Sequence, residues 1–230
     1  MKYLDRIRVV QFFLFERQDL RLSEITGIIG PNGSGKSAML DAVQIAMFGA
    51  NSRLVALNAQ ADEQATTRSL RAYCLGQYGE NPEHRARENA TTYITLVWRD
   101  SETGEPLSMG VCLYASADRE KHEMLGRYIL PKIELAMSDH LETVDGEERP
   151  RDWSTFRHQL IERARVSGED PLFHDSQRYI QAALLALRGT GSAPHTESFI
   201  RAFRFALRMR FDKSVDQIVP LTRPEGDFRY

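Results

Sequence analysis

The sequence has few cysteines and no long apolar run. Its two cysteines, Cys74 and Cys112, lie far apart and have no histidine at metal-ligand spacing. This spacing argues against a disulfide framework and a zinc site, and a reducing cytosol is the simplest compartment. No run of about 18 apolar residues is present, and residues 1–10 alternate charged with apolar side chains. The sequence therefore predicts neither a membrane span nor a signal peptide.

The sequence also lacks an excess of either charge. It has 30 Lys and Arg against 32 Asp and Glu, which gives a formal net charge of −2 at pH 7. A generally basic surface for nucleic acid is therefore not expected, and any DNA contact would be local. With 230 residues and 42% hydrophobic side chains, the chain is long enough to bury a core as one large or two small domains.

The N-terminal part of the chain predicts strands followed by a loop and a helix. Tyr3–Phe15 and Leu20–Leu22 predict two pairing strands, and Glu24–Ile29 predicts a buried strand. Good helix formers run from Lys36 to Phe48, and Gly49 ends this predicted helix.

The middle of the chain predicts strands again. Asn51–Glu83 is expected to hold little regular structure. Thr91–Arg99 and Leu107–Tyr114 alternate on either side of a turn and predict a β-hairpin. Tyr128–Leu130 predicts a further strand, and Ser138–Arg151 predicts a long exposed connection.

Three helices are predicted after this connection, each from its capping residue. Asp152 is expected to cap a helix through Arg163, and Ser176 one through Leu187 that Gly189 ends. A last helix is predicted from Thr196 to about Phe211.

The segment Gly30-Pro31-Asn32-Gly33-Ser34-Gly35-Lys36-Ser37 matches the phosphate-loop pattern G-x-x-x-x-G-K-[ST] between a predicted strand and a predicted helix. Glycines let consecutive backbone N–H groups surround a phosphate, and the helix start adds the positive end of its dipole. Lys36 is expected to reach the β and γ phosphates, and the Ser37 hydroxyl to join the Mg²⁺ shell. The predicted cofactor-binding residues are Asn32, Gly33, Ser34, Gly35, Lys36 and Ser37, with Lys36 also catalytic.

The loop does not decide the reaction, because kinases, GTPases and ATPases all use it. The chain resembles the N-terminal ATP-binding half of SMC and SMC-like heads, in the MukB, MksB and JetC branch that includes the Wadjet plasmid-defence ATPases. The motifs that carry the resemblance are the phosphate loop, Leu40-Asp41-Ala42-Val43-Gln44, Ser69-Leu70-Arg71-Ala72-Tyr73-Cys74-Leu75-Gly76, Ser108-Met109-Gly110-Val111-Cys112-Leu113-Tyr114 and Phe211-Asp212-Lys213-Ser214-Val215-Asp216.

The resemblance implies an α/β P-loop NTPase fold with a flanking antiparallel β-sheet and C-terminal helices that lead to a coiled coil. Residues 1–50 would hold the strands, phosphate loop and first helix, 51–135 the arginine loop and hairpin, and 136–230 the helical region. It further implies ATP and Mg²⁺ as cofactors, a second head as homodimer partner, kleisin and KITE subunits, double-stranded DNA and, in Wadjet, a toprim nuclease subunit. Such a complex would be cytoplasmic and nucleoid-associated.

Two parts of a complete ATPase head are absent from the sequence. Leu96-Val97-Trp98-Arg99-Asp100 has a strand and an Asp but no following Glu, and no Leu-Ser-Gly-Gly-Gln stretch occurs. In SMC-like proteins these parts belong to a C-terminal half, so the chain is expected to bind nucleotide weakly and not to hydrolyse it alone. A self-contained P-loop kinase or NTPase, or a regulatory nucleotide-binding module, are the alternatives.

Other candidate site residues rest on weaker patterns. The resemblance implies a nucleotide contact for Gln11, and for Arg71, with Arg68 as its substitute, a contact with nucleotide phosphate or with DNA. Arg71 is as easily a solvated side chain. It also implies a metal-contacting glutamine, for which Gln159, Gln177 and Gln181 are available without a choice between them.

A basic stripe is present near the end of the sequence. Arg201, Arg204 and Arg208 recur at helical spacing, with Phe199, Phe203 and Leu207 on the opposed face. The stripe is either a solvated or coiled-coil-adjoining face, or a contact with DNA phosphates that reads no bases.

Overall fold

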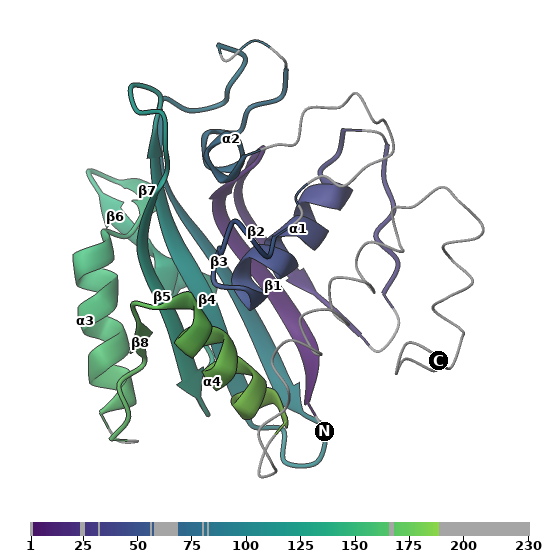
Figure 1. Cartoon of the computed structure of the whole chain (residues 1–230), viewed down its shortest axis with the longest axis vertical. Helices are drawn as coiled ribbons and strands as arrows, with labels where there is room; N and C mark the ends of the chain where they lie inside the picture. Colours follow the sequence, from purple (N-terminus) through teal and green to yellow (C-terminus); the bar gives the residue numbers. More distant parts are fainter. Residues whose placement is uncertain are drawn as a thin grey trace.

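A six-stranded antiparallel sheet lies at the centre of the fold (Figure 1). The structure is a computed structural model, and it describes residues 2–23, 26–31, 33–55, 57, 69–79, 81, 83–165 and 168–188. In spatial order the strands are β2 (Phe15–Arg21), β1 (Lys2–Phe12), β3 (Asn89–Asp100), β4 (Pro106–Ser116), β5 (Glu123–Pro131) and β8 (Leu172–Phe173). A separate two-stranded sheet consists of β6 (Leu141–Val144) and β7 (Glu147–Pro150).

Pairing strands are confirmed at the start and in the middle of the chain, although the first predicted strand, Tyr3–Phe15, extends through the turn into β2. β1 and β2 form a hairpin in which Phe12 lies opposite Phe15, and β3 and β4 form a hairpin with Thr95 opposite Gly110. The predicted strand at Tyr128–Leu130 is the last part of β5. The antiparallel sheet is thus the central element of the described part of the chain. The sequence had predicted such a sheet only as a flanking element.

Helices cover both faces of this sheet. On one face lie α1 (Lys36–Met47), α2 (Leu70–Leu75) and α4 (Ser176–Arg188), and on the other lie α3 (Trp153–Ala164) and the short 3-10 helix η1 (Met137–His140) (Figure 1). Within β3, Ile94 packs with the α1 side and Tyr93 with the α3 side, and both are fully buried. Successive side chains of β3 therefore point to opposite faces of the sheet, and both faces are buried.

The caps of α3 and α4 differ in how well the sequence predicted them. The Asp152 carboxylate accepts hydrogen bonds from the N–H groups of Ser154 and Thr155, as predicted. α4 is capped by Asp175, whose carboxylate accepts from the Arg178 N–H, while the Ser176 hydroxyl accepts from the Asn51 amide. The prediction of Ser176 as the cap was wrong, because the acid one position earlier takes that role. Gly189 and the predicted helix from Thr196 lie outside the described residues.

Two regions are more ordered than the sequence predicted. α2 lies inside Asn51–Glu83, capped by the Ser69 hydroxyl on the Ala72 N–H and ended by Gly76 at φ 67°. Its six residues are too few to show a helical period. Ser138–Arg151 was predicted to be a long exposed connection: residues 145–149 are exposed, but the stretch holds part of η1 and the β6–β7 hairpin, and Asp139 and His140 are buried.

The predicted buried strand before the phosphate loop is also wrong for the residues described. Residues 26–31 form no strand, and the Ile29 side chain is 96% exposed. Glu24 and Ile25 lie outside the described residues. Within the described part of the chain no strand is hydrogen-bonded to this segment, and a strand needs such a partner to form.

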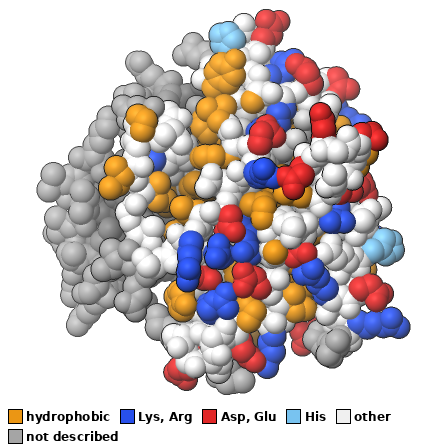
Figure 2. All heavy atoms as spheres, turned by 180° about the vertical axis from the view of Figure 1, so that it is seen from behind, with side chains coloured by type: hydrophobic (Ala, Val, Ile, Leu, Met, Phe, Trp, Pro, Cys, Tyr) orange, Lys and Arg blue, Asp and Glu red, His pale blue; other side chains and the backbone are white. Residues whose placement is uncertain are grey.

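Charges on the back face of the molecule are paired locally. Arg8 is buried and pairs with Asp19 and Glu134, and Arg99 pairs with Glu134 and Asp5. Figure 2 shows Lys and Arg side chains interleaved with Asp and Glu on this face. This pairing agrees with the nearly balanced composition. None of the helices in the described part of the chain has the length and apolar character that a membrane span requires.

A buried polar chain joins the sheet to η1. His140 places Nδ1 2.9 Å from the Ala136 carbonyl oxygen and Nε2 2.7 Å from Thr95 Oγ1, which is 2.6 Å from the Tyr128 hydroxyl. These partners fit a neutral ring that donates from Nδ1 to Ala136 and accepts the Thr95 hydroxyl at Nε2. Burial lowers the pKa of His140 from 6.5 to about 4.

This depressed pKa predicts a loss of stability in mild acid. Between pH 6.5 and about 4 the unfolded chain binds a proton at His140 that the folded chain does not, so the free energy of unfolding falls as pH is lowered through this window. The shift corresponds to about 3 kcal/mol. Urea unfolding of His140→Gln should show a shallower pH dependence than the parent chain. The exposed His158→Gln serves as control, and an equal slope in all three proteins would contradict the prediction.

Candidate functional site

The backbone of the phosphate loop adopts left-handed conformations at two of its glycines. Gly33 and Gly35 have φ values of 83° and 88°, in the left-handed region that favours glycine. A Cβ on Gly30 would lie 2.7 Å from the Ser34 hydroxyl oxygen, so a larger residue here would make the Ser34 side chain move. The loop turns back on itself through a bond from the Ser34 N–H to the Pro31 carbonyl oxygen.

Lys36 lies across this loop. Its ammonium nitrogen is 2.7 Å from the Gly30 carbonyl oxygen and 2.6 Å from that of Pro31. An ammonium group has three N–H donors, so two are used by the loop and a third remains for a phosphate oxygen. The charge is held over the turn where the sequence predicted a phosphate to bind.

α1 begins at Lys36 and brings the positive end of its dipole to the loop. The first N–H groups of a helix have no acceptor within it, so they are available to an anion. The other end of α1 is fixed: the Tyr179 hydroxyl donates to the Ala46 carbonyl oxygen at 2.7 Å, and Arg127 Nε to that of Gly49 at 2.6 Å. The guanidinium also complements the negative end of the dipole.

A buried contact ties α1 to α2. Asp41 is 2% exposed, and its carboxylate accepts the Tyr73 hydroxyl and the Gln44 amide. The Tyr73 ring is stacked on Phe12 at 5.0 Å, and its carbonyl oxygen accepts the Phe13 N–H at 2.7 Å. Tyr73 therefore holds the phosphate-loop helix against the turn of the β1–β2 hairpin.

The same hairpin returns to the loop through Phe15. A Cβ on Gly35 would lie 2.5 Å from Phe15 Cζ, so the ring packs directly on this glycine. Arg87 holds the hairpin turn by donating to the carbonyl oxygens of Phe13 at 2.7 Å and Phe15 at 3.0 Å. Sequence reasoning missed Tyr73, Arg87 and Arg127 because their partners, the Asp41 carboxylate and backbone carbonyl oxygens, are distant in the sequence.

Arg71 lies on α2 and is engaged by the β4–β5 turn. Its guanidinium donates to the carbonyl oxygens of Ala117 at 3.0 Å and Arg119 at 2.6 Å. In this arrangement it joins α2 to that turn, and a contact between Arg71 and nucleotide stays a prediction. Its substitute Arg68 lies outside the described residues.

Gln11 is held at the end of β1. Its side-chain oxygen accepts the Thr91 N–H at 3.1 Å, its carbonyl oxygen accepts the Thr92 hydroxyl at 2.6 Å, and its φ is 47°. A nucleotide contact by Gln11 also stays a prediction.

The three glutamines considered as metal contacts lie on α3 and α4. Gln159 lies on α3, across the sheet from α1, and donates to Asp139 at 3.0 Å. Gln177 and Gln181 are exposed on α4. Gln159 therefore has a structural partner on the face opposite to the loop.

The donors present fit a phosphate-bound Mg²⁺ better than a protein-held metal. In the part of the chain that the structure describes, no three His, Cys, Asp or Glu side chains are placed to hold a metal ion. Mg²⁺ usually keeps several waters and binds one or two protein groups together with substrate phosphates. Ser37, in the first turn of α1, is the residue that would contribute the protein ligand.

Several predicted site residues cannot be placed. Asn32 and the arginine stripe of Arg201, Arg204 and Arg208 lie outside the described residues. Of the predicted loop residues, the structure places Gly33, Ser34, Gly35, Lys36 and Ser37 together at the start of α1.

Comparison with protein families gives one match at this site. Residues 4–64 match the P-loop containing region of AAA domain. The match spans β1, β2, the phosphate loop and α1, and it supports a P-loop nucleotide-binding region in this part of the 230-residue chain. A comparison with curated proteins found no match.

The contact between Phe15 and Gly35 generates a prediction about stability. Gly35→Ala adds a methyl group against the Phe15 ring at a left-handed position, whereas Gly104→Ala at φ 71° meets no atom within 4 Å. Gly104→Ala should cost about 1 kcal/mol of unfolding free energy for the backbone alone, and Gly35→Ala about 1–3 kcal/mol more. Chemical denaturation of both variants measures the difference. Equal losses would show that Phe15 does not press on Gly35.

Proposed function

We propose that the chain is the ATP- and Mg²⁺-binding N-terminal half of an SMC-like ATPase head of the MukB, MksB and JetC branch. The observation that carries the nucleotide-binding part is Lys36, held over a glycine loop at the start of α1. The match to a P-loop containing region supports the same part. The assignment to this branch rests on the sequence motifs.

The segment that leads into the loop supports the proposal of a missing second half. Ile28 and Ile29 directly precede Gly30, yet Ile29 is 96% exposed and, in the residues described, nothing pairs with its backbone. An apolar β-branched segment of this kind is typical of a buried strand. A C-terminal half that adds a strand here would bury Ile29 and complete the nucleotide site.

The acid at the end of β3 has another role. Asp100 ends β3, and its carboxylate accepts the N–H groups of Glu102 at 2.9 Å and Thr103 at 3.1 Å. These bonds lower its pKa and close the β3–β4 turn. Asp100 is thus a turn residue, and we infer that the acid that activates water for hydrolysis belongs to the second half.

In the proposed head dimer, Lys36 and the α1 amides would neutralise phosphate charge, and Ser37 would help to hold Mg²⁺. Two heads, each completed by its C-terminal half, would enclose ATP and act on double-stranded DNA with kleisin and KITE subunits. The DNA process would be loop extrusion, in chromosome condensation or in plasmid restriction with a toprim nuclease subunit. The complex would be cytoplasmic and nucleoid-associated.

Removing the Lys36 charge tests the nucleotide site. Lys36→Ala should weaken binding of ATP·Mg²⁺ by about ten- to a hundredfold, because a hydrogen bond to a charged group contributes about 1.5–3 kcal/mol. Lys132→Ala is a matched control, since this exposed lysine pairs with Glu105 at the surface. Titration of a fluorescent ATP analogue measures both. Equal affinities for the two variants would contradict the assignment.

The same variant tests whether the chain is half of an enzyme. Phosphate release from the purified chain should stay at background, and it should rise when a C-terminal half carrying the signature and acid motifs is added. Steady hydrolysis by the chain alone, abolished by Lys36→Ala, would favour a self-contained P-loop NTPase or kinase. Nucleotide binding that never leads to hydrolysis would favour a regulatory module.

The DNA contact is proposed from the arginine stripe alone. Reversing the charges of Arg204 and Arg208 should weaken DNA binding by the complete complex at low salt, since each lost phosphate contact reduces a salt-dependent affinity. An electrophoretic mobility shift assay at two salt concentrations measures this. Unchanged binding would remove the stripe from the DNA-contacting surface.

A further inference from the structure

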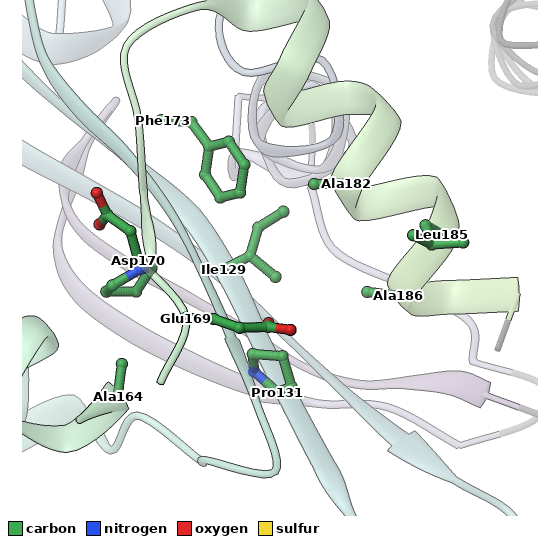
Figure 3. Close-up of a pocket in the computed structure, with 10 residues that line it drawn as sticks. Ile129, Pro131, Ala164, Glu169, Asp170, Phe173, Ala182, Leu185 and Ala186 are labelled. Carbon is green, nitrogen blue, oxygen red and sulfur yellow. The ribbon is translucent and has the colours of Figure 1, made fainter. Parts of the chain in front are cut away.

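An apolar pocket lies between α4 and the outer edge of the main sheet, away from the phosphate loop (Figure 3). Its volume is about 210 Å³, and its walls include Ile129 of β5, Phe173 of β8, and Ala182, Leu185 and Ala186 of α4. Leu185 is 52% exposed at the mouth. A cavity of about 150 Å³ is large enough for benzene, so this pocket admits one aromatic side chain.

One side of the mouth is acidic. Figure 3 shows the Glu169 carboxylate extending under Ile129 toward Ala186, while the Asp170 carboxylate is turned away from α4. Asp170 already accepts the Leu172 N–H at 3.0 Å. Glu169 is exposed, so an occupant that carries a positive charge next to an aromatic group would suit this mouth.

The chain itself contains a segment in which aromatic and positively charged side chains lie close together. Residues 199–211 include four Phe and four Arg and no acidic residue. At the helical spacing noted above, Phe199, Phe203 and Leu207 share one face with Arg210, and Arg201, Arg204 and Arg208 lie on the other. An apolar face of this size is rarely left in contact with water.

The segment begins close enough to return to the pocket. α4 ends at Arg188, one helical turn after Leu185 at the pocket mouth. Residues 189–198 join α4 to the segment, and ten residues span up to about 33 Å when extended. This stretch contains two glycines and a proline, which are typical of a turn.

We propose that the pocket formed by α4, β5 and β8 is the docking site for residues 199–211 of the same chain, with an aromatic side chain of the Phe199, Phe203 and Leu207 face inserted beside Ile129 and Glu169 paired with an arginine at the mouth. Docking on this face brings Arg210 to the mouth beside Glu169 and leaves the stripe of Arg201, Arg204 and Arg208 directed outward. The pocket would thus fix the direction of the chain after α4, and this role does not depend on nucleotide binding at the phosphate loop.

Hydrogen exchange of the full chain, read by mass spectrometry, tests this docking. Backbone amides of residues 199–211 should exchange at least about tenfold more slowly than in a free peptide of the same sequence. Leu185→Asp should remove this protection, and Ile161→Asp, which changes another exposed apolar residue on α3, should not. Unchanged protection of β3 and β4 in both variants shows that the fold is intact.

A second variant probes the charge at the mouth. Glu169→Lys should reduce the protection of residues 199–211 by repelling the arginines, whereas Glu120→Lys, an exposed acid elsewhere, should leave it unchanged. Rapid exchange of residues 199–211 in the parent chain would overturn the proposal, as would protection that survives both Leu185→Asp and Glu169→Lys. Protection that rises with protein concentration together with a dimer mass would identify a second copy as the occupant and overturn it as well.

Discussion

The position of α1 on the antiparallel sheet is the constraint on which the rest of the structure depends. Its N-terminal amides must stay free of protein partners if they are to receive a phosphate, so the helix has to be held elsewhere. Tyr179 and Arg127 hold its C-terminal carbonyl groups, and Asp41 holds its middle to Tyr73. The loop itself is shaped by glycines and by the Phe15 ring on Gly35.

This arrangement explains why a balanced overall charge is compatible with an anion site. Positive potential at the loop comes from one ammonium group and one helix end, whereas Arg8, Arg99 and Arg127 are each engaged by carboxylates or carbonyl oxygens. The phosphate-binding charge is therefore local. It does not require the basic surface that the composition lacks.

Local sequence patterns predicted much of this site. They did not predict the contacts between residues that are distant in the sequence. The phosphate loop, the helix after it and both hairpins followed from spacing and turn residues. The role of Arg71 at the β4–β5 turn and of Asp100 at the β3–β4 turn depends on backbone atoms that sequence patterns do not locate. The predicted strand at Glu24–Ile29 was wrong over residues 26–29, because strand propensity does not form a strand without a neighbouring strand to pair with. The exposed Ile29 is the observation on which the proposed second half rests.

The central claim is that nucleotide phosphates bind at the start of α1. Backbone amide chemical shifts of the labelled chain, recorded during titration with ATP·Mg²⁺, test it most directly. The account predicts the largest shifts at Gly33, Gly35 and Lys36 with ATP·Mg²⁺ or inorganic triphosphate, and none at these amides with adenosine. If saturating ATP·Mg²⁺ left the chemical shifts of these three amides unchanged and moved those of other residues, the result would contradict the claim.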